Sequence, residues 1–429
     1  MAKNTSKSHR NQVMYQIYVR NFSEEGTFRA VIPSLNRIKD LGVDIIWFAP
    51  IHPIGKKARK GKLGSPYAIS DYRAVNPEYG TMDDFKETVA AIHAAGMKCM
   101  IDVVYNHTSP DSVLSMEHPE WFFHKSDGSF GNRVGDWSDI IDLDYSNKGL
   151  WDYQIETLKM WAEIVDGFRC DVAPLVPIDF WKKARTEVEK VHPGAIWLSE
   201  SIDPQFIMNM RELGLVAHSD CEMYDAFDIL YDYDIYGQLT GYASGTRTLH
   251  DYSDAINRQE YIYPDNYIKL RFLENHDQPR ARFLFPNEKV LRNATAFLYF
   301  QKGMTLIYAG QEYGISHLPD LFNKDSVEWE SAEKIDLTHL MKKLYEIKQD
   351  SLFADSTYRT KTYDENVIKA IHSRNGKKMI GMFSFKGEPG IIPINVADGR
   401  YKNLIDGSTI EVMHGYVSLP GDPVIIRVN

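Results

Sequence analysis

One short apolar segment of this chain ends on an arginine and an aspartate that stand two residues apart. The segment is Gly167–Asp171 (GFRCD), and it follows a stretch with apolar residues at helical spacing. On a strand, residues two apart point to the same face, so Arg169 and Asp171 would lie side by side. A carboxylate beside a guanidinium stays ionised and is a candidate nucleophile. Taken alone, however, such a pair is more often a structural ion pair at a strand end.

Charged residues also stand at the ends of other short apolar segments. Three such groups occur along the chain: Asp102 to His107 (DVVYNH), Glu200, and Glu274 to Asp277 (ENHD). A single acidic residue after a strand is typical of a helix N-cap. Several of them on different strands, converging on one rim, are hard to explain as caps and indicate an active site.

This combination of residues suits glycoside hydrolysis, which needs no cysteine, metal cluster or phosphate loop. A retaining mechanism uses one ionised carboxylate and one protonated carboxyl, roughly 5–5.5 Å apart. Asp171 beside Arg169 suits the nucleophile, and Glu200 follows an apolar segment that would raise its pKa and suit the general acid. Three further residues would stabilise the transition state or bind sugar hydroxyls: Asp277, His107 and His276.

Strand and helix patterns alternate along most of the chain. The predicted strands cover 13–19, 44–48, 98–104, 167–171, 195–199, 221–226, 268–273 and 305–309. The predicted helices cover 29–41, 81–95, 153–165, 177–191, 247–258, 287–301 and 336–349. This alternation predicts an α/β fold, a closed (β/α)8 TIM barrel with its active site at the carboxyl ends of the strands.

Two segments do not follow the alternation. Residues 108–148 lie between the third strand and its helix and are rich in Asp, Ser, Gly and aromatics, which predicts a small inserted domain over the barrel. Residues 351–429 have a period of two with Asn-Gly and Asp-Gly turns, which predicts a C-terminal all-β sandwich domain. The catalytic barrel would then comprise residues 1–107 and 149–350.

Composition narrows the class of protein. The chain has 429 residues, 43% hydrophobic and 25% charged, which is typical of a soluble globular protein, and its net charge of −10 argues against nucleic-acid binding. The three cysteines are far apart, so a disulfide scaffold or a cysteine metal site is not expected. No apolar run predicts a membrane span, and residues 1–10 lack a signal peptide, so we expect a cytoplasmic protein; a secreted protein with a processed signal is the alternative.

At this point the chain resembles the α-amylase family of glycoside hydrolases (glycoside hydrolase family 13), over nearly its whole length. Four segments of this sequence, DVVYNH, GFRCD, LSES and NHD, resemble the four conserved regions of that family and occur in the same order. Further family marks are Gly64 to Tyr67 (GSPY), Asp71-Tyr72, Met14 to Tyr18 (MYQIY) and Gly310 to Glu312 (GQE).

The resemblance assigns roles to the residues found above. It implies Asp171 as nucleophile, Glu200 as acid/base and Asp277 as transition-state stabiliser. It also implies a sugar subsite lined by Tyr67, His107, Arg169 and His276, with Tyr67 stacking on the ring. Without its flanking motif Tyr67 would be taken for a core tyrosine. The inserted segment would be the family's domain B, where Asp136, Trp137 and Asp139 either contact sugar or fix the loop.

The chain departs from the family pattern at the residues after the nucleophile, and the presence of the family's structural calcium is left open. Many α-amylases carry a Lys-His pair where this chain has Pro174 and Leu175, which puts the leaving-group contacts and the substrate length in doubt. The family's structural calcium often uses residues that match Asn106 and Asp142, and such oxygen ligands suit a hard cation. Asn106 is equally compatible with a hydrogen bond that holds its loop. No organic cofactor is expected.

The sequence therefore predicts a retaining hydrolase of α-1,4-glucosidic bonds in starch-derived α-glucans or maltooligosaccharides. A transglycosylase, or a cyclomaltodextrinase or neopullulanase, would use the same catalytic residues and stays an alternative. A non-catalytic binding module is disfavoured because all three carboxylates are present. The basic run 56–62 (KKARKGK) is interpreted as a solvated loop. The oligomeric state is not predicted.

Overall fold

The chain folds around a closed barrel of eight parallel strands. The computed structural model describes residues 4–135 and 137–428, so Asp136 and the first three residues of the polar N-terminal stretch lie outside it. The strand order around the barrel is β1-β10-β9-β8-β7-β6-β3-β2. The bounds are β1 Val13–Ile17, β2 Ile45–Phe48, β3 Lys98–Val103, β6 Gly167–Cys170, β7 Ile196–Ser199, β8 Ile229–Tyr231, β9 Lys269–Arg271 and β10 Met304–Tyr308. The predicted (β/α)8 barrel is confirmed.

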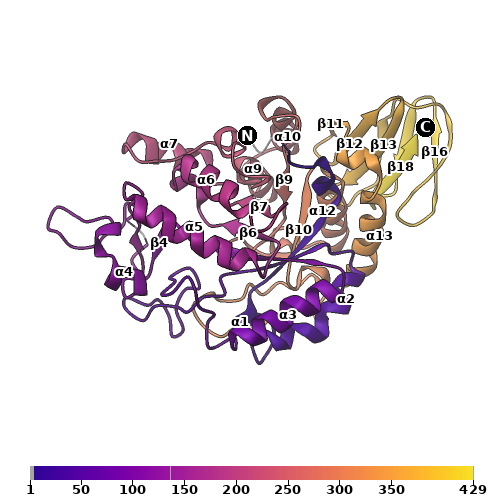
Figure 1. The fold of residues 1–429 in the computed structure, drawn as a ribbon. Helices are drawn as coiled ribbons and strands as arrows, with labels where there is room; N and C mark the ends of the chain where they lie inside the picture. The colour runs from indigo at the N-terminus through magenta and orange to yellow at the C-terminus, as the bar shows by residue number, and fades with distance from the viewer. Residues whose placement is uncertain (1–3, 136, 429) are drawn as a thin grey trace.

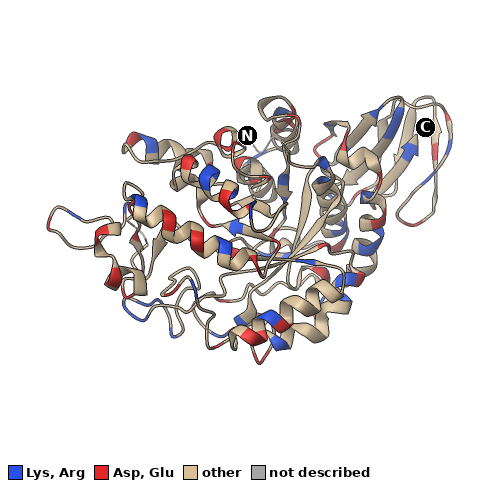
Figure 2. Cartoon of the chain, in the orientation of Figure 1, with Lys and Arg blue, Asp and Glu red and all other residues tan. Residues whose placement is uncertain are grey.

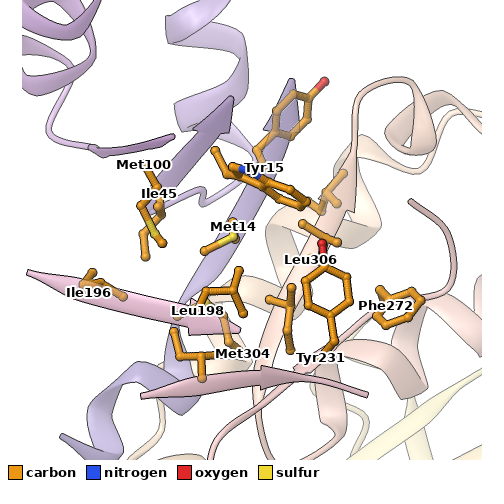
Figure 3. Packing of buried hydrophobic residues seen from close by; sticks show 14 of the residues in the cluster. Met14, Tyr15, Ile45, Met100, Ile196, Leu198, Tyr231, Phe272, Met304 and Leu306 are labelled. Carbon is orange, nitrogen blue, oxygen red and sulfur yellow. The ribbon is translucent and has the colours of Figure 1, made fainter. Parts of the chain in front are cut away.

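The interior of the barrel has an apolar floor and a polar top. Figure 3 shows the floor, where side chains such as Met14, Met100 and Met304 from different strands pack against one another. Two residues further along β1 and β3, the same inward-facing positions carry Gln16 and Asp102, because side chains on a strand repeat with a period of two. In β1 and β3 the inward-facing positions therefore change from apolar to polar toward the carboxyl end of the strand.

Helices surround the barrel, and Figure 1 shows them outside the strands. The longer ones are α2 Leu35–Asp40, α3 Met82–Ala94, α5 Lys148–Ala162, α6 Ile178–Val188, α7 Pro204–Glu212, α9 Tyr233–Ala243, α10 Leu249–Ile262, α12 Glu288–Phe300 and α13 Thr338–Lys348. The short ones are α1 Val19–Phe22, α4 Val113–Glu117, α8 Asp220–Met223, α11 Ala281–Leu284 and α14 Ser351–Ala354. Figure 2 shows the charged residues spread along these outer helices.

One predicted strand is wrong. Residues 221–226 do not form a strand, since Asp220–Met223 is the short helix α8, and the barrel strand of this region is β8. A capping box explains the helix: the Ser219 side chain caps the third residue, and Glu222 bonds back to the backbone of Ser219. The predicted helix 29–41 begins as a 3-10 turn, Arg29–Ser34, which contains Pro33.

Two further parts complete the chain. Between β3 and α5, strands β4 His107–Thr108 and β5 Ile141–Asp142 pair in a small antiparallel sheet. The C-terminal part forms two four-stranded antiparallel sheets with their own apolar core, which confirms the predicted β domain. Their strands are β11 Thr357–Tyr363, β12 Val367–Arg374, β13 Lys377–Ser384, β18 Val424–Val428, and β14 Gly390–Pro393, β15 Gly399–Lys402, β16 Thr409–Met413, β17 Tyr416–Leu419. In Figure 1 the inserted segment and the C-terminal sheets lie at opposite sides of the barrel. Among the described residues, no helix has the length and apolar character needed to cross a membrane.

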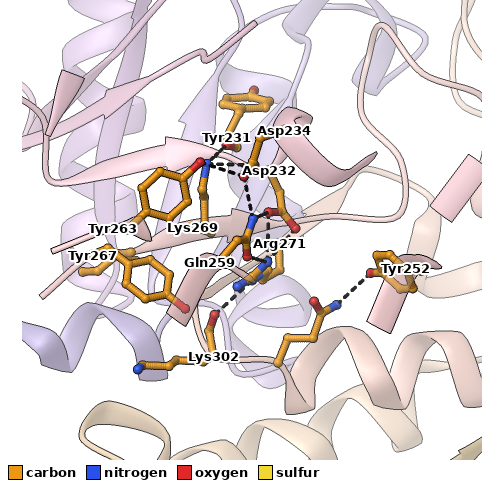
Figure 4. Close-up of polar contacts among 12 residues, drawn as sticks. Tyr231, Asp232, Asp234, Tyr252, Gln259, Tyr263, Tyr267, Lys269, Arg271 and Lys302 are labelled. Atoms are coloured by element: carbon orange, nitrogen blue, oxygen red, sulfur yellow. Dashed lines mark hydrogen bonds and ion pairs between the residues drawn. The ribbon is translucent and has the colours of Figure 1, made fainter. Parts of the chain in front are cut away.

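A buried ionic network ties the outer helices to β9 (Figure 4). Lys269 contacts Asp234 at 2.9 Å, and it also pairs with Asp220 of α8. Arg271, two residues on, pairs with Asp232 at 2.8 Å. The Lys269 and Arg271 side chains are fully buried, so each depends on its carboxylate partners.

Candidate active site

A single buried guanidinium connects three carboxylates at the top of the barrel. Nη1 of Arg169 donates to Oδ1 of Asp102 and to Oδ1 of Asp171, both at 2.8 Å. Nη2 of Arg169 lies 3.0 Å from Oε2 of Glu200. Asp102 lies next to the last residue of β3, Asp171 follows β6 and Glu200 follows β7, so three neighbouring strands deliver these groups. The predicted contact between Arg169 and Asp171 is present.

The turn after β6 also positions Glu200. Val172, directly after Asp171, has a φ of 34° and a ψ of 40°, a left-handed conformation that is rare for a β-branched residue. In this conformation the N–H of Val172 donates to Oε2 of Glu200 at 2.8 Å. Such backbone strain persists where the surrounding structure holds it, and it is common at functional sites.

Burial gives Asp171 and Glu200 different proton affinities. Burial raises the pKa of Asp171 to about 6, although Arg169 works in the opposite direction. Burial raises the pKa of Glu200 further, to about 8, and Arg169 again opposes the rise, while the charge of Asp171 adds to it. Near neutral pH, Asp171 is therefore mainly ionised and Glu200 mainly protonated.

A second charged group forms at the loop after β9. Nε2 of His276 lies 3.0 Å from Oδ2 of Asp277, whose side chain is 40% exposed. Burial works against the charged form of Asp277, but the adjacent His276 outweighs it and lowers the pKa of Asp277. The ring of Tyr67 stacks on His276 with centroids 5.3 Å apart, and Gln16 contacts Nδ1 of His276 at 2.6 Å. Asp277 therefore stays anionic beside the pocket.

These groups meet at one pocket. Its cavity volume is about 310 Å³, and it is lined by Lys60, Ser65, Tyr67, His107, Trp137, Asp139, Ile140, Asp171, Val172, Glu200, Asp277, Leu321 and Phe322. The structure thus brings together five of the seven predicted catalytic and substrate residues at its wall. The other two, Arg169 and His276, are buried and contact the lining carboxylates.

Sequence reasoning did not assign several residues of this site. Asp102 is the most important of them, because it pairs with Arg169 and accepts from the hydroxyl of Tyr67 at 3.2 Å. Its position two residues after the inward-facing Met100 was a usable signal. Leu321 and Phe322 come from the loop after β10, whose sequence carries no pattern that places it at the pocket.

The inserted segment contributes to the same pocket. The ring of Trp137 lies 5.6 Å from that of His107, and Asp139 forms an ion pair with Lys60 at 3.0 Å. The predicted contribution of Asp136 lies outside the described residues. The run 56–62 is largely exposed, as expected for a solvated loop, but Lys60 is half-buried and lies at the pocket, where it pairs with Asp139.

The candidate calcium ligands lie at a neighbouring cavity. Asn106 and Asp142 both line it, together with Arg133 and Leu175. Oδ1 of Asp142 is buried without a hydrogen-bond partner among the described residues, which would suit a cation. Oδ2, however, accepts from the backbone N–H of Arg133 at 2.7 Å, and the guanidinium of Arg133 lies 3.6 Å away.

The side chains around Asp142 offer few further oxygen ligands for calcium. Calcium takes six to eight oxygen ligands, and the side-chain nitrogen of Asn106 contacts Nδ1 of His107 at 3.1 Å. Within residues 4–135 and 137–428, no group of three or more His, Cys, Asp or Glu side chains is arranged to hold a metal ion. The residues present fit a calcium ion poorly, and Arg133 supplies a positive charge to Asp142 instead.

Comparison with known proteins agrees with this geometry. The family described as "Alpha amylase, catalytic domain" matches residues 6–376, and the "Bacterial Alpha amylase C-terminal domain" matches residues 359–426. A crystal structure of an α-amylase from Lactobacillus plantarum is 46% identical, with a TM-score of 0.95, and the match covers 99% of this chain and 100% of that one. A maltogenic α-amylase, AmyB, from Thermotoga neapolitana is 33% identical, with a TM-score of 0.86, over 98% and 99% of the two chains.

Curated relatives are longer than this chain. The α-amylase MalA of Haloarcula japonica is 25% identical over 97% of this chain but only 63% of its own length. An α-1,4-glucan:maltose-1-phosphate maltosyltransferase of Burkholderia pseudomallei is 30% identical over 75% of this chain and 29% of its own length. This chain therefore spans less than two thirds of the length of these relatives.

Proposed function

Because this chain belongs to the α-amylase family of glycoside hydrolases, we propose that it is a retaining hydrolase of α-1,4-glucosidic bonds in α-glucans and maltooligosaccharides. The observation that carries the proposal is the difference in pKa between Asp171 and Glu200, which both contact Arg169. One carboxyl in the pocket is ionised near neutral pH and its neighbour is protonated. A retaining glycosidase needs this pair of states.

In the first step of the proposed reaction, Asp171 attacks the anomeric carbon. Arg169 engages Oδ1 of Asp171, which leaves Oδ2 for the attack. Glu200 donates its proton to the leaving glycosidic oxygen, so the bond to the leaving sugar breaks as the bond to Asp171 forms.

In the second step, water releases the sugar from Asp171. Glu200, now ionised, takes a proton from a water molecule, and the resulting hydroxyl attacks the anomeric carbon. Asp171 leaves as a carboxylate, and the α configuration is restored. The anionic Asp277 offsets the positive charge that develops on the sugar in both steps.

Sugar recognition in this proposal rests on rigid groups. Tyr67 lines the pocket and offers its ring as a stacking surface, because His276 and Asp102 hold it in place. Burial lowers the pKa of His107 to about 4, so its imidazole is neutral and able to hydrogen-bond a sugar hydroxyl.

A second candidate function is glycosyl transfer to another sugar. It is favoured by the maltosyltransferase relative, which matches three quarters of this chain. The first step would be the same, and the acceptor in the second step would be a sugar hydroxyl in place of water. Cyclic or branched glucans are the other substrates that fit the same catalytic groups.

Product analysis tests these proposals together. Reducing-sugar release would be measured on maltoheptaose, soluble starch, β-cyclodextrin and pullulan, with Glu200→Gln as the control. We expect the wild type to release α-anomeric maltooligosaccharides and the control to lose this activity. Products longer than the substrate would instead favour transfer. No release from any of the four glucans would refute the proposed hydrolase.

A further inference from the structure

A short loop between β2 and α3 lies at the edge of the catalytic pocket. We refer to residues 54–65 as the rim loop. Its Lys60 forms the ion pair with Asp139 of the inserted segment, and both side chains line the pocket beside Tyr67 and His107. The Asp139 side chain is 7% exposed, whereas that of Lys60 is 36% exposed and reaches solvent. The pair therefore joins the barrel to the inserted segment at the entrance.

The rim loop is fixed on the side of the inserted segment. The backbone N–H groups of Lys56 and Lys57 donate to Oδ2 of Asp111 at 2.8 and 3.1 Å. Gly55 stands so close to Ser109 that a Cβ there would lie 2.1 Å from the Cβ of Ser109. These contacts fix the backbone of the rim loop against the inserted segment.

The rim loop is also fixed on the side of the loop after β10. The N–H of Lys62 donates to Oδ1 of Asn323, and the N–H of Leu63 donates to the carbonyl of Phe322, both at 3.0 Å. Gly61 has a φ of +62°, and a Cβ at this position would lie 2.6 Å from the Cβ of Phe322. The rim loop thus forms a continuous wall from the inserted segment to Phe322.

The rim loop can be assigned to one side of the bond that is cleaved in the proposed reaction. The proposed mechanism places the glycone on Asp171, beside Tyr67 and His107, and the leaving sugar on Glu200. Sugars beyond the glycone continue toward the non-reducing end of the chain. Lys60 and Asp139 line the same pocket as Tyr67 and His107, which places them within reach of those sugars. The pocket volume of about 310 Å³ is also at the lower end of the range for ligand sites, about 300–1,000 Å³.

We propose that Lys60 and Asp139 end the substrate site toward the non-reducing end and bind hydroxyls of the terminal sugar. The enzyme then removes short products of fixed length from chain ends. A charged donor and a charged acceptor suit this role, because hydrogen bonds to ionised groups are stronger than those between neutral groups. This inference rests on the proposed function of the same pocket.

The test compares Lys60→Ala and Asp139→Ala with the wild type. Lys62→Ala is the matched control, since it removes an exposed lysine of the same loop and keeps the backbone bond to Asn323. Thermal unfolding shows that each variant is folded, and Lys60→Met, which keeps most of the stem, replaces Lys60→Ala if that variant is not. The substrates are maltoheptaose with a p-nitrophenyl group at its reducing end, maltotriose, and amylose.

We expect one dominant short product from the wild type and from Lys62→Ala. Lys60→Ala and Asp139→Ala should give products of several lengths. With these variants, the colour of the amylose–iodine complex should decrease more for each reducing end that is released. Their kcat/KM for maltotriose should fall about tenfold, the effect of losing one hydrogen bond to a charged group. Random internal cleavage by the wild type, or an unchanged product pattern in both variants, would overturn the inference. Failure of the proposed function is distinct, because the wild type would then release no reducing sugar at all.

Discussion

Replacing Asp102 by asparagine probes the charge balance around Arg169. Asp102 and Asp171 each lie 2.8 Å from the same nitrogen, so their oxygens are at most about twice that distance apart. Burial is the main reason that the pKa of Asp171 is raised to about 6, and the charge of Asp102 raises it further against the opposing effect of Arg169. Removing that charge should lower the pKa of Asp171.

The expected shift follows from Coulomb's law. Two unit charges about 5.6 Å apart repel by about 3 kcal/mol at an effective dielectric constant of about 20, which corresponds to about two pKa units. Arg169 lies next to both carboxylates and offsets part of this repulsion. Burial also raises the pKa of Asp102 to about 6, so Asp102 carries only part of its charge at the acidic limb, and we expect a shift of about one unit. Since Asp171 must be ionised to attack, the acidic limb of the activity profile should move to lower pH.

The assay is the pH dependence of kcat/KM on a short maltooligosaccharide. Asp152→Asn is the control, because it removes the same charge from an exposed site on α5, 71% exposed. The acidic limb of Asp102→Asn should move down by about one unit while that of the control stays in place. An acidic limb that stays or moves to higher pH would refute the assignment of Asp171 as the group that must be ionised.

Three further outcomes follow from the structure. The wild-type profile should be bell-shaped, falling below about pH 6 as Asp171 gains a proton and above about pH 8 as Glu200 loses one; activity that keeps rising past pH 9 would contradict the role of Glu200. A chelator should leave activity and Tm unchanged, and a large loss of Tm with chelator would instead indicate a bound cation. Arg133→Ala, by contrast, should lower the free energy of unfolding by about 1–3 kcal/mol, because Asp142 then loses its only charged partner among the described residues. Lys269→Met should lower the free energy of unfolding in urea by about 3–5 kcal/mol, because it leaves Asp220 and Asp234 buried without their cation, and an unchanged urea midpoint would contradict this.

The barrel could be predicted from the sequence because each buried strand carries a local signal. Apolar segments such as 98–104 and 195–199 are short, and helical patterns separate them. The error at 221–226 arose because apolar residues occur there without helical periodicity, and the capping box at Ser219 was overlooked. Strand β8 itself is only three residues long, too short for its period to be recognised.

From residue types and topology alone, the candidate site could be predicted where it follows a strand end, whereas Tyr67 was found through the motif that resembles the family. Asp171 and Glu200 lie directly after strands, so their convergence follows from the topology of the barrel. Lys60 and Phe322 come from irregular loops, and their positions depend on tertiary contacts that no local pattern encodes. The contribution of Asp102 was missed for a different reason, since Asp102 does not line the pocket and acts there through Arg169, Tyr67 and its charge beside Asp171.

Trapping the sugar on the enzyme tests the central claim most directly. With α-maltosyl fluoride and Glu200→Gln, fluoride leaves without an acid, but water cannot be activated to release the sugar. Mass spectrometry of the digested protein should then find a maltosyl ester on Asp171. A maltosyl ester on another residue, or no ester while the wild type hydrolyses the fluoride, would contradict the account.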